Sequence, residues 1–215
     1  MKELKFGPPV LISTISEKLR ADLLLEGIQQ RDDAKSHLAG HIENEKTYSE
    51  LLKKKFESDI LIKIKEYIEW IRIERDIKHS NYKTTLNSLW INRQKSAEHN
   101  PPHRHYNGEI SFVIYLDFPQ EIINEQPFSE ASYRPGTISF FYGNNTQLDV
   151  TPRTKLINNL MSPLASIQHT PKKGEMIIFP SYLIHYVSPF YTQGVERISV
   201  SGNVSVIQTD IKSII

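Results

Sequence analysis

Residues 110–116, Ile-Ser-Phe-Val-Ile-Tyr-Leu, form a nearly continuous apolar run that predicts a buried strand. The segment that leads into this run, 100–109, is polar and carries His103, His105 and Glu109 at odd positions. Because alternate residues of a strand point to the same face, these three side chains can converge on one point. The chain therefore places a group of possible metal ligands directly before a core strand.

Short apolar runs continue from Thr84 onward and predict a mainly β region. Pro and Gly residues separate the runs, and this spacing is typical of barrels and sandwiches. The predicted strands are residues 86–92, 111–116, 137–142, 176–179, 183–187 and 197–206. The polar segments 119–135 and 144–171 are expected to be lid or binding loops because of their length.

The first third of the chain has helical periodicity instead. Residues 8–12 predict a short entry strand, and Thr14 followed by Glu17 matches a capping box for a first helix. Its apolar residues Ile15, Leu19, Leu23 and Ile28 have roughly helical spacing, and we expect the helix to be interrupted at 37–41, with Gly40 as the breaker. A second helix is predicted over 47–78, with a break near Ser58, from the apolar stripe Phe56, Ile60, Ile64, Ile68 and Ile71. We expect both helices to cover the outside of the sheet.

This division predicts one domain spanning 1–215, with a helical support region (1–83) and a β core (84–207). A chain of 215 residues is ordinary for one domain, and all-β barrels often reach this size undivided.

The composition excludes several classes of function. The chain has no cysteine, which excludes disulfides, thiolate metal sites and a cysteine nucleophile. Its 26 Lys and Arg residues against 25 Asp and Glu leave no net field to attract nucleic acid or a membrane surface. The N-terminal residues contain no apolar signal segment, and no apolar run has the length of a membrane-spanning helix. We expect a soluble, cytoplasmic protein, and either a monomer or a homodimer is compatible with these features.

A second group of candidate site residues lies far downstream. His185 is on the predicted strand 183–187, and neutral imidazoles suit iron, nickel, copper and zinc. Arg197 begins the last strand, and a guanidinium group pairs both oxygens of a carboxylate. Ser199 lies on the same strand face, and Asn203 and Tyr115 have the same odd parity. The alternative interpretation of Arg197 is a surface ion pair with Glu196.

The other histidines have weaker patterns. His37 and His41 are four residues apart, but the intervening Gly40 favours a loop over a helical metal clamp. His79, His99 and His169 are interpreted as exposed or supporting residues.

Taken together, these motifs resemble the double-stranded β-helix (jelly-roll, cupin-like) core of iron(II)- and 2-oxoglutarate-dependent oxygenases. The chain is similar in particular to small oxygenases of bacteria and cyanobacterial phages. The resemblance covers about 86–206, and the stretches that carry it are Trp90-x-Asn92, Asn100-Pro-Pro-His103, Phe179-Pro-Ser181 and Arg197-Ile-Ser199-x-Ser-Gly-Asn203.

The resemblance implies roles for these residues. His103 and His185 would be the two histidines of the metal triad, and Arg197, helped by Ser199, would bind the far carboxylate of 2-oxoglutarate. Asn92, Tyr115 and Asn203 are further candidates for the 2-oxoglutarate pocket.

One position departs from the family pattern. The usual triad has Asp or Glu two residues after its first histidine, and this chain has His105 there. Either His105 ligates and gives a three-histidine site, or Glu109 takes the place of the carboxylate. We hypothesise that His103, His105 and His185 ligate, with Glu109 as a possible fourth ligand or as a hydrogen-bond acceptor for a ligating histidine.

The activity implied is that of an iron(II)- and 2-oxoglutarate-dependent dioxygenase, which uses dioxygen and releases succinate and CO2. We expect hydroxylation of an amino-acid side chain or of a small molecule, and no motif identifies this primary substrate. Two alternatives are a cupin-type metalloenzyme that does not use 2-oxoglutarate and a non-catalytic β-barrel binding or structural module.

Overall fold

A computed structural model of the protein describes residues 7–34, 38–78, 80–126, 134–143 and 166–209. Its elements, in chain order, are β1 (Leu11–Thr14), α1 (Glu17–Gly27), β2 (Asn44–Thr47), α2 (Glu50–Glu74), β3 (Tyr82–Gln94), β4 (Asn100–His103), β5 (Ile110–Asp117), α3 (Gln120–Asn124), β6 (Ile138–Phe141), β7 (Ser166–His169), β8 (Glu175–Pro180), β9 (Ile184–Val187) and β10 (Arg197–Gln208).

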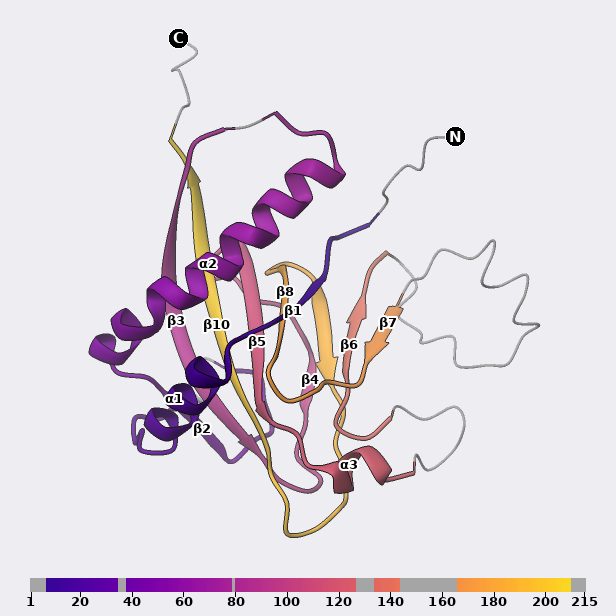
Figure 1. The fold of residues 1–215 in the computed structure, drawn as a ribbon. Coiled ribbons are helices and arrows are strands. Elements are labelled where there is room, and N and C mark those ends of the chain that lie inside the picture. Colours follow the sequence, from indigo (N-terminus) through magenta and orange to yellow (C-terminus); the bar gives the residue numbers. More distant parts are fainter. Residues whose placement is uncertain (1–6, 35–37, 79, 127–133, 144–165, 210–215) are drawn as a thin grey trace, which may run out of the picture.

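The strands form two antiparallel sheets. The larger sheet has the order β1-β8-β5-β10-β3-β2, and the smaller has the order β4-β9-β6-β7. Figure 1 shows the smaller sheet beside the larger one, on the side away from α1 and α2. This arrangement confirms the predicted mainly β, jelly-roll core with N-terminal helices, and all six predicted strands are present within a few residues of their expected bounds.

The larger sheet buries apolar side chains on both faces, as the nearly continuous apolar run in β5 requires. Phe112, Ile114 and Leu116 belong to the core shared with the helices. Val113 and Tyr115 point to the opposite face and pack in the core between the two sheets. Strand alternation thus separates a supporting core from a core that adjoins the interior of the jelly roll.

The cap of helix α1 is Ser16, two residues after the predicted cap Thr14, and the helix ends at Gly27, before the interruption predicted at 37–41. Thr14 is the last residue of β1 and pairs with Glu175, whereas the Ser16 side chain accepts a hydrogen bond from the Leu19 amide at 3.2 Å. Glu17 does not complete a capping box, because its carboxylate accepts from Arg20. Arg20 also donates to the Leu116 carbonyl at 2.8 Å, which ties α1 to β5.

Helix α2 is a single helix, so the predicted break near Ser58 is wrong. Ser49 caps it by accepting from the Leu52 amide, and the helix ends at Glu74 rather than Lys78. The predicted apolar stripe faces the sheet, with Phe56, Ile60 and Ile64 fully buried. Among the described residues, no helix is both long and apolar enough to cross a membrane.

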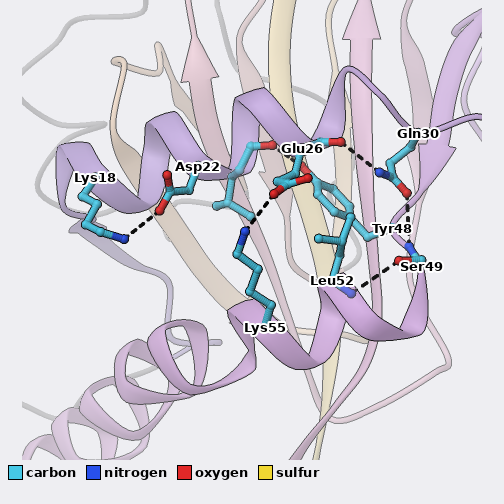
Figure 2. A network of polar contacts seen from close by, with 9 residues as sticks. Lys18, Asp22, Glu26, Gln30, Tyr48, Ser49, Leu52 and Lys55 are labelled. Carbon is cyan, nitrogen blue, oxygen red and sulfur yellow. Dashed lines mark hydrogen bonds and ion pairs between the residues drawn. The ribbon is translucent and has the colours of Figure 1, made fainter.

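A polar network joins α1 to α2 and to Tyr48, the residue that follows β2 (Figure 2). The Tyr48 hydroxyl donates to the Leu23 carbonyl of α1 at 2.6 Å, and Lys55 of α2 pairs with Glu26 of α1 at 2.8 Å. Gln30 accepts from the Ser49 amide where α2 begins. These contacts hold the segment that links β2, an edge strand of the larger sheet, to α2.

Several short elements were not predicted. The second helix was expected to begin at Thr47, but Thr47 is the last residue of β2. Helix α3 and strand β7 lie inside the segments 119–135 and 144–171, which were predicted to be loops. The remainder of these two segments falls largely on 127–133 and 144–165, outside the described residues, so the predicted lids are not addressed there.

Candidate metal centre

Three histidines meet between the two strands that begin the smaller sheet. His103, at the end of β4, is the register partner of His185 on β9, and His105 follows two residues later. One potential ligand atom from each ring lies within 4.8 Å of the others. The ring centroids of His103 and His185 are 4.2 Å apart, and each is 5.1 Å from that of His105.

Two of the rings are oriented by backbone carbonyls. The Nδ1 atom of His103 lies 2.7 Å from the Pro101 carbonyl oxygen, and Nδ1 of His185 lies 2.9 Å from that of Leu183. A carbonyl oxygen only accepts, so each Nδ1 carries the proton and donates. This tautomer leaves Nε2 of both rings as a lone-pair donor, which is the state that a metal ligand needs.

Burial keeps the imidazoles neutral. It lowers the pKa of His103 against the opposing effect of the Pro101 hydrogen bond. Burial, helped by the nearby His103, lowers the pKa of His105 to about 4. The same causes, with His105 added, hold the pKa of His185 well below its usual value. At neutral pH the three rings therefore offer unprotonated nitrogens.

The structure does not bring Glu109 to this cluster. Its carboxylate is exposed and accepts from the Val206 amide at 2.7 Å. The parity argument fails because the chain turns between β4 and β5, with Gly108 at a φ of +131°. His105 is held on the other side of this turn, where its amide donates to the Ser181 carbonyl at 2.9 Å.

Arg197 is buried, and the surface ion pair considered for it is wrong. Its side chain lies over the Tyr115 ring, with 5.6 Å from Cζ to the ring centroid, and the residue is 2% exposed. Its Nη1 donates to the Gly136 carbonyl at 2.9 Å. Glu196 pairs with Arg93 instead, at 2.7 Å. A buried guanidinium directed into a cavity is suited to binding an anion.

The cavity that the histidines line also receives the side chains of Arg197, Ser199, Asn92 and Tyr115. Two of these groups have donor atoms without a partner among the described residues, namely Nε of Arg197 and the hydroxyl of Tyr115. Burial raises the pKa of Tyr115 to about 12, so its hydroxyl keeps its proton at neutral pH. The amide of Asn92 differs, because its Nδ2 donates to Ser201 and its Oδ1 is the atom left without a partner.

Asn203 is not brought into this cavity. Its Oδ1 accepts from Ser111, and its Nδ2 donates to Ser88. Ser111 in turn contacts the Ser181 hydroxyl at 2.8 Å. Asn203 thus belongs to a polar link to Ser181, whose carbonyl accepts from the His105 amide. Asn203 therefore supports the turn that carries His105.

Three residues of the site were missed by the sequence analysis. Gly136, at a φ of +67°, supplies the carbonyl that holds Arg197, and the Ser181 backbone positions His105. Glu45 of β2 is 1% exposed and lines the same cavity. The motif Phe179-Pro-Ser181 pointed toward Ser181, but no pattern in the sequence marks Glu45 or Gly136 as site residues.

The remaining histidines lie elsewhere. His169 is on β7 and contacts Glu175 at 2.7 Å, and His41 stacks on His99 with 4.9 Å between ring centroids. His37 and His79 are outside the described residues.

The donor set fits iron(II). Neutral imidazole nitrogens are ligands for iron as well as for nickel, copper and zinc, and a face of three ligands leaves coordination positions for other molecules. The group of possible ligands contains no carboxylate among the described residues, so it would add no negative charge to the metal.

A family model described as "Putative 2OG-Fe(II) oxygenase" matches residues 88–203, more than half of the chain. A comparison with curated proteins finds no match to the sequence.

Several solved structures are similar in fold. A 2OG-Fe(II) oxygenase family oxidoreductase from Burkholderia pseudomallei has a TM-score of 0.55 and 11% identity, over 91% of this chain and 84% of that one. HygX from Streptomyces hygroscopicus, with nickel, 2-oxoglutarate and hygromycin B bound, has a TM-score of 0.53 and 11% identity, over 94% and 83%. The collagen prolyl hydroxylase of Paramecium Bursaria Chlorella virus-1, in its 2-oxoglutarate complex, has a TM-score of 0.50 and 14% identity, over 91% and 94%.

At these identities the structural similarities show the fold alone. The family match covers the strands that carry His103, His185 and Arg197. By that match the chain belongs to the family of 2OG-Fe(II) oxygenases, enzymes that use iron(II) and 2-oxoglutarate.

Proposed function

We propose that this oxygenase hydroxylates an amino-acid side chain or a related small molecule at an iron(II) ion held by His103, His105 and His185. The observation that carries the proposal is the shared cavity, in which three neutral imidazoles lie beside the buried guanidinium of Arg197. When bound, iron(II) with 2-oxoglutarate and dioxygen supplies the oxidising chemistry, with release of succinate and CO2.

The histidines would act as oriented ligands. The carbonyls of Pro101 and Leu183 accept from Nδ1 of His103 and His185, so Nε2 of each ring would be available to hold the metal. His105 takes the position at which the family pattern has a carboxylate. Its backbone bond to Ser181 fixes the loop, so a neutral third ligand is preorganised without help from Glu109.

Arg197, Ser199 and Tyr115 would bind the far carboxylate of 2-oxoglutarate. A carboxylate only accepts hydrogen bonds, and all three side chains can donate. The donor atoms without a partner in Arg197 and Tyr115 support this role, because burying such atoms is costly until a ligand satisfies them. The surrounding apolar side chains would exclude water from the same site.

The test is an anaerobic titration of the metal-stripped protein with iron(II) and then with 2-oxoglutarate, followed by visible absorption. We expect a weak charge-transfer band that appears only when both are present. Arg197→Ala should weaken 2-oxoglutarate binding by about 100-fold, since a hydrogen bond to a charged group contributes about 1.5–3 kcal/mol and 1.4 kcal/mol is a factor of ten.

Arg93→Ala is the matched control, because Arg93 is on the neighbouring strand β3 but pairs with Glu196 at the surface. This variant should bind 2-oxoglutarate as the wild type does. Iron binding without the band would favour a cupin-type enzyme that does not use 2-oxoglutarate, and absence of iron binding would contradict the proposed function.

A further inference from the structure

A row of polar side chains crosses the interior face of the larger sheet at the level of the metal centre. Glu45 on β2 is the register partner of Asn92 on β3, Asn92 is that of Ser199 on β10, and Ser199 is that of Tyr115 on β5. Register partners of neighbouring strands point to the same face. All four side chains are buried and line the cavity of the three histidines.

The two ends of this row differ in chemistry. Tyr115 and Ser199, with Arg197 nearby on β10, present hydrogen-bond donors and a positive charge. Asn92 presents its Oδ1, an acceptor without a partner among the described residues, and Glu45 presents a carboxyl group. Neighbouring strands are about 4.8 Å apart, so Glu45 lies roughly 10 Å from Ser199 along the row.

A further acceptor lies at the Glu45 end. Gly40 lies between Glu45 and Asn100. A Cβ added to Gly40 would overlap Asn100 Oδ1 and would lie 2.8 Å from Glu45 Oε1, so these two side-chain oxygens are close to each other. Trp90, two residues from Asn92 on the same face of β3, lines the same cavity, where its ring centroid is 5.9 Å from that of His105. The acceptors of Glu45, Asn92 and Asn100 therefore line a cavity that also contains a tryptophan ring.

The position of Glu45 is fixed by its surroundings. Its carbonyl accepts from the Ala34 amide at 3.0 Å, and β2 is followed directly by Tyr48, which donates to α1 (Figure 2). These contacts fix the Glu45 backbone, and a buried carboxyl group on a cavity wall interacts strongly with an ion of opposite charge. Glu45 is also the only acidic residue among the described residues that line this cavity.

We infer that the primary substrate carries a positively charged nitrogen group, an ammonium or a guanidinium, which binds at Glu45, Asn92 and Asn100. The inference rests on the proposed function, because it places the substrate beside 2-oxoglutarate in one cavity. 2-Oxoglutarate has only acceptor oxygens, so it does not suit this acceptor-rich end. A nitrogen cation has several N–H donors for these acceptors and is attracted to the face of a tryptophan ring.

The inference is tested with a matched pair of small probes, n-butylguanidinium and its neutral analogue n-butylurea. Their dissociation constants are measured by calorimetry on the whole 215-residue chain loaded anaerobically with iron(II) and 2-oxoglutarate. We expect the wild type to bind the cation at least tenfold more tightly. Glu45→Gln should reduce this preference to less than threefold, whereas Glu43→Gln, which removes an exposed carboxylate just before β2, should retain it.

Equal binding of the two probes by the wild type would overturn the inference, as would a preference that persists in Glu45→Gln. The wild-type comparison does not depend on a variant that folds. Asn100→Asp is a second variant, which adds a carboxylate to the same corner and should increase the preference for the cation; an unchanged preference would contradict the site.

The outcome is separable from that of the proposed function, because the same probes are also titrated into metal-free protein. The protein could prefer the cation in a way that depends on Glu45 and yet form no iron–2-oxoglutarate band. That result would support the cation site and contradict the roles proposed for the three histidines and Arg197. A normal band without any preference would contradict only the cation site.

Discussion

His105 is the residue at which this chain differs from the usual metal triad of its family. We expect His105→Ala to weaken iron(II) binding by at least about 100-fold, since loss of a direct ligand should cost no less than the 10–100-fold caused by loss of a ligand's supporting contacts. Glu109→Ala should leave iron affinity unchanged, because its exposed carboxylate binds the Val206 amide. Competition with a coloured chelator measures both affinities.

His105→Asp provides a control for folding, because it supplies the carboxylate that the family pattern has at this position. This variant should retain iron(II). If Glu109→Ala lost iron while His105→Ala kept it, the three-histidine assignment would be wrong.

Tyr115 leads to a prediction in which stability and binding change in opposite directions. Its buried hydroxyl has no partner among the described residues, so Tyr115→Phe should leave the urea midpoint of the metal-free protein unchanged or raise it. The same change should weaken 2-oxoglutarate binding by about 1.5–3 kcal/mol, on the order of 10- to 100-fold, through loss of one donor to a charged carboxylate. Urea unfolding followed by circular dichroism and the anaerobic titration give the two quantities.

Tyr48→Phe is the matched substitution at a buried tyrosine whose hydroxyl is used. Tyr48 donates to the Leu23 carbonyl, so this variant should lose roughly 1–2 kcal/mol of stability without a change in 2-oxoglutarate affinity. Equal losses of stability in the two variants would mean that Tyr115 has a structural partner.

At the scale of elements, the turn before β6 holds Arg197 in place. Gly136 has a φ of +67°, and an added Cβ would lie 2.9 Å from Ile122 Cγ2. Gly136→Ala should therefore cost at least about 1 kcal/mol of stability from the left-handed backbone alone. It should also weaken 2-oxoglutarate binding, since the Gly136 carbonyl that accepts from Arg197 would shift.

Gly194→Ala separates the two effects. Gly194 has a φ of +78°, and its added Cβ would meet nothing within 4 Å. This variant should show a similar loss of stability from backbone strain, measured by urea unfolding, with normal 2-oxoglutarate affinity. If Gly136→Ala also bound 2-oxoglutarate normally, its carbonyl would not be needed to position Arg197.

The elements also show how far the sequence could predict the structure. The long apolar run of β5 and the strands carrying His185 and Arg197 were predicted because their patterns are local. Glu45 was missed because β2, Asn-Glu-Lys-Thr, has no apolar alternation, and its burial arises from pairing with β3. Glu109 was wrongly expected in the cluster, because side-chain parity is valid only within a continuous strand. The turn at Gly108 interrupts the strand before Glu109.

At the scale of the whole molecule, the helical third is built into the β core. β1 and β2, both from this region, form the two edges of the larger sheet. Phe56, Ile60 and Ile64 of α2 pack in one core with residues of β3, β5, β8 and β10. A unit that contributes both edge strands and the cover of a sheet should not unfold separately from it.

The two tryptophans test this single cooperative unit, because Trp70 lies on α2 and Trp90 on β3. In Trp90→Phe, the remaining fluorescence reports on the helical region, and in Trp70→Phe it reports on the β core. We expect the fluorescence transition and the far-ultraviolet circular dichroism transition in urea to coincide within each variant. Because both transitions are compared within the same variant, the effect of the substitution on stability cancels. A Trp70 signal that changed at lower urea than the circular dichroism signal would show that the helices unfold first. The edges of the larger sheet, including the strand that carries Glu45, would then be lost before the core that carries the histidines.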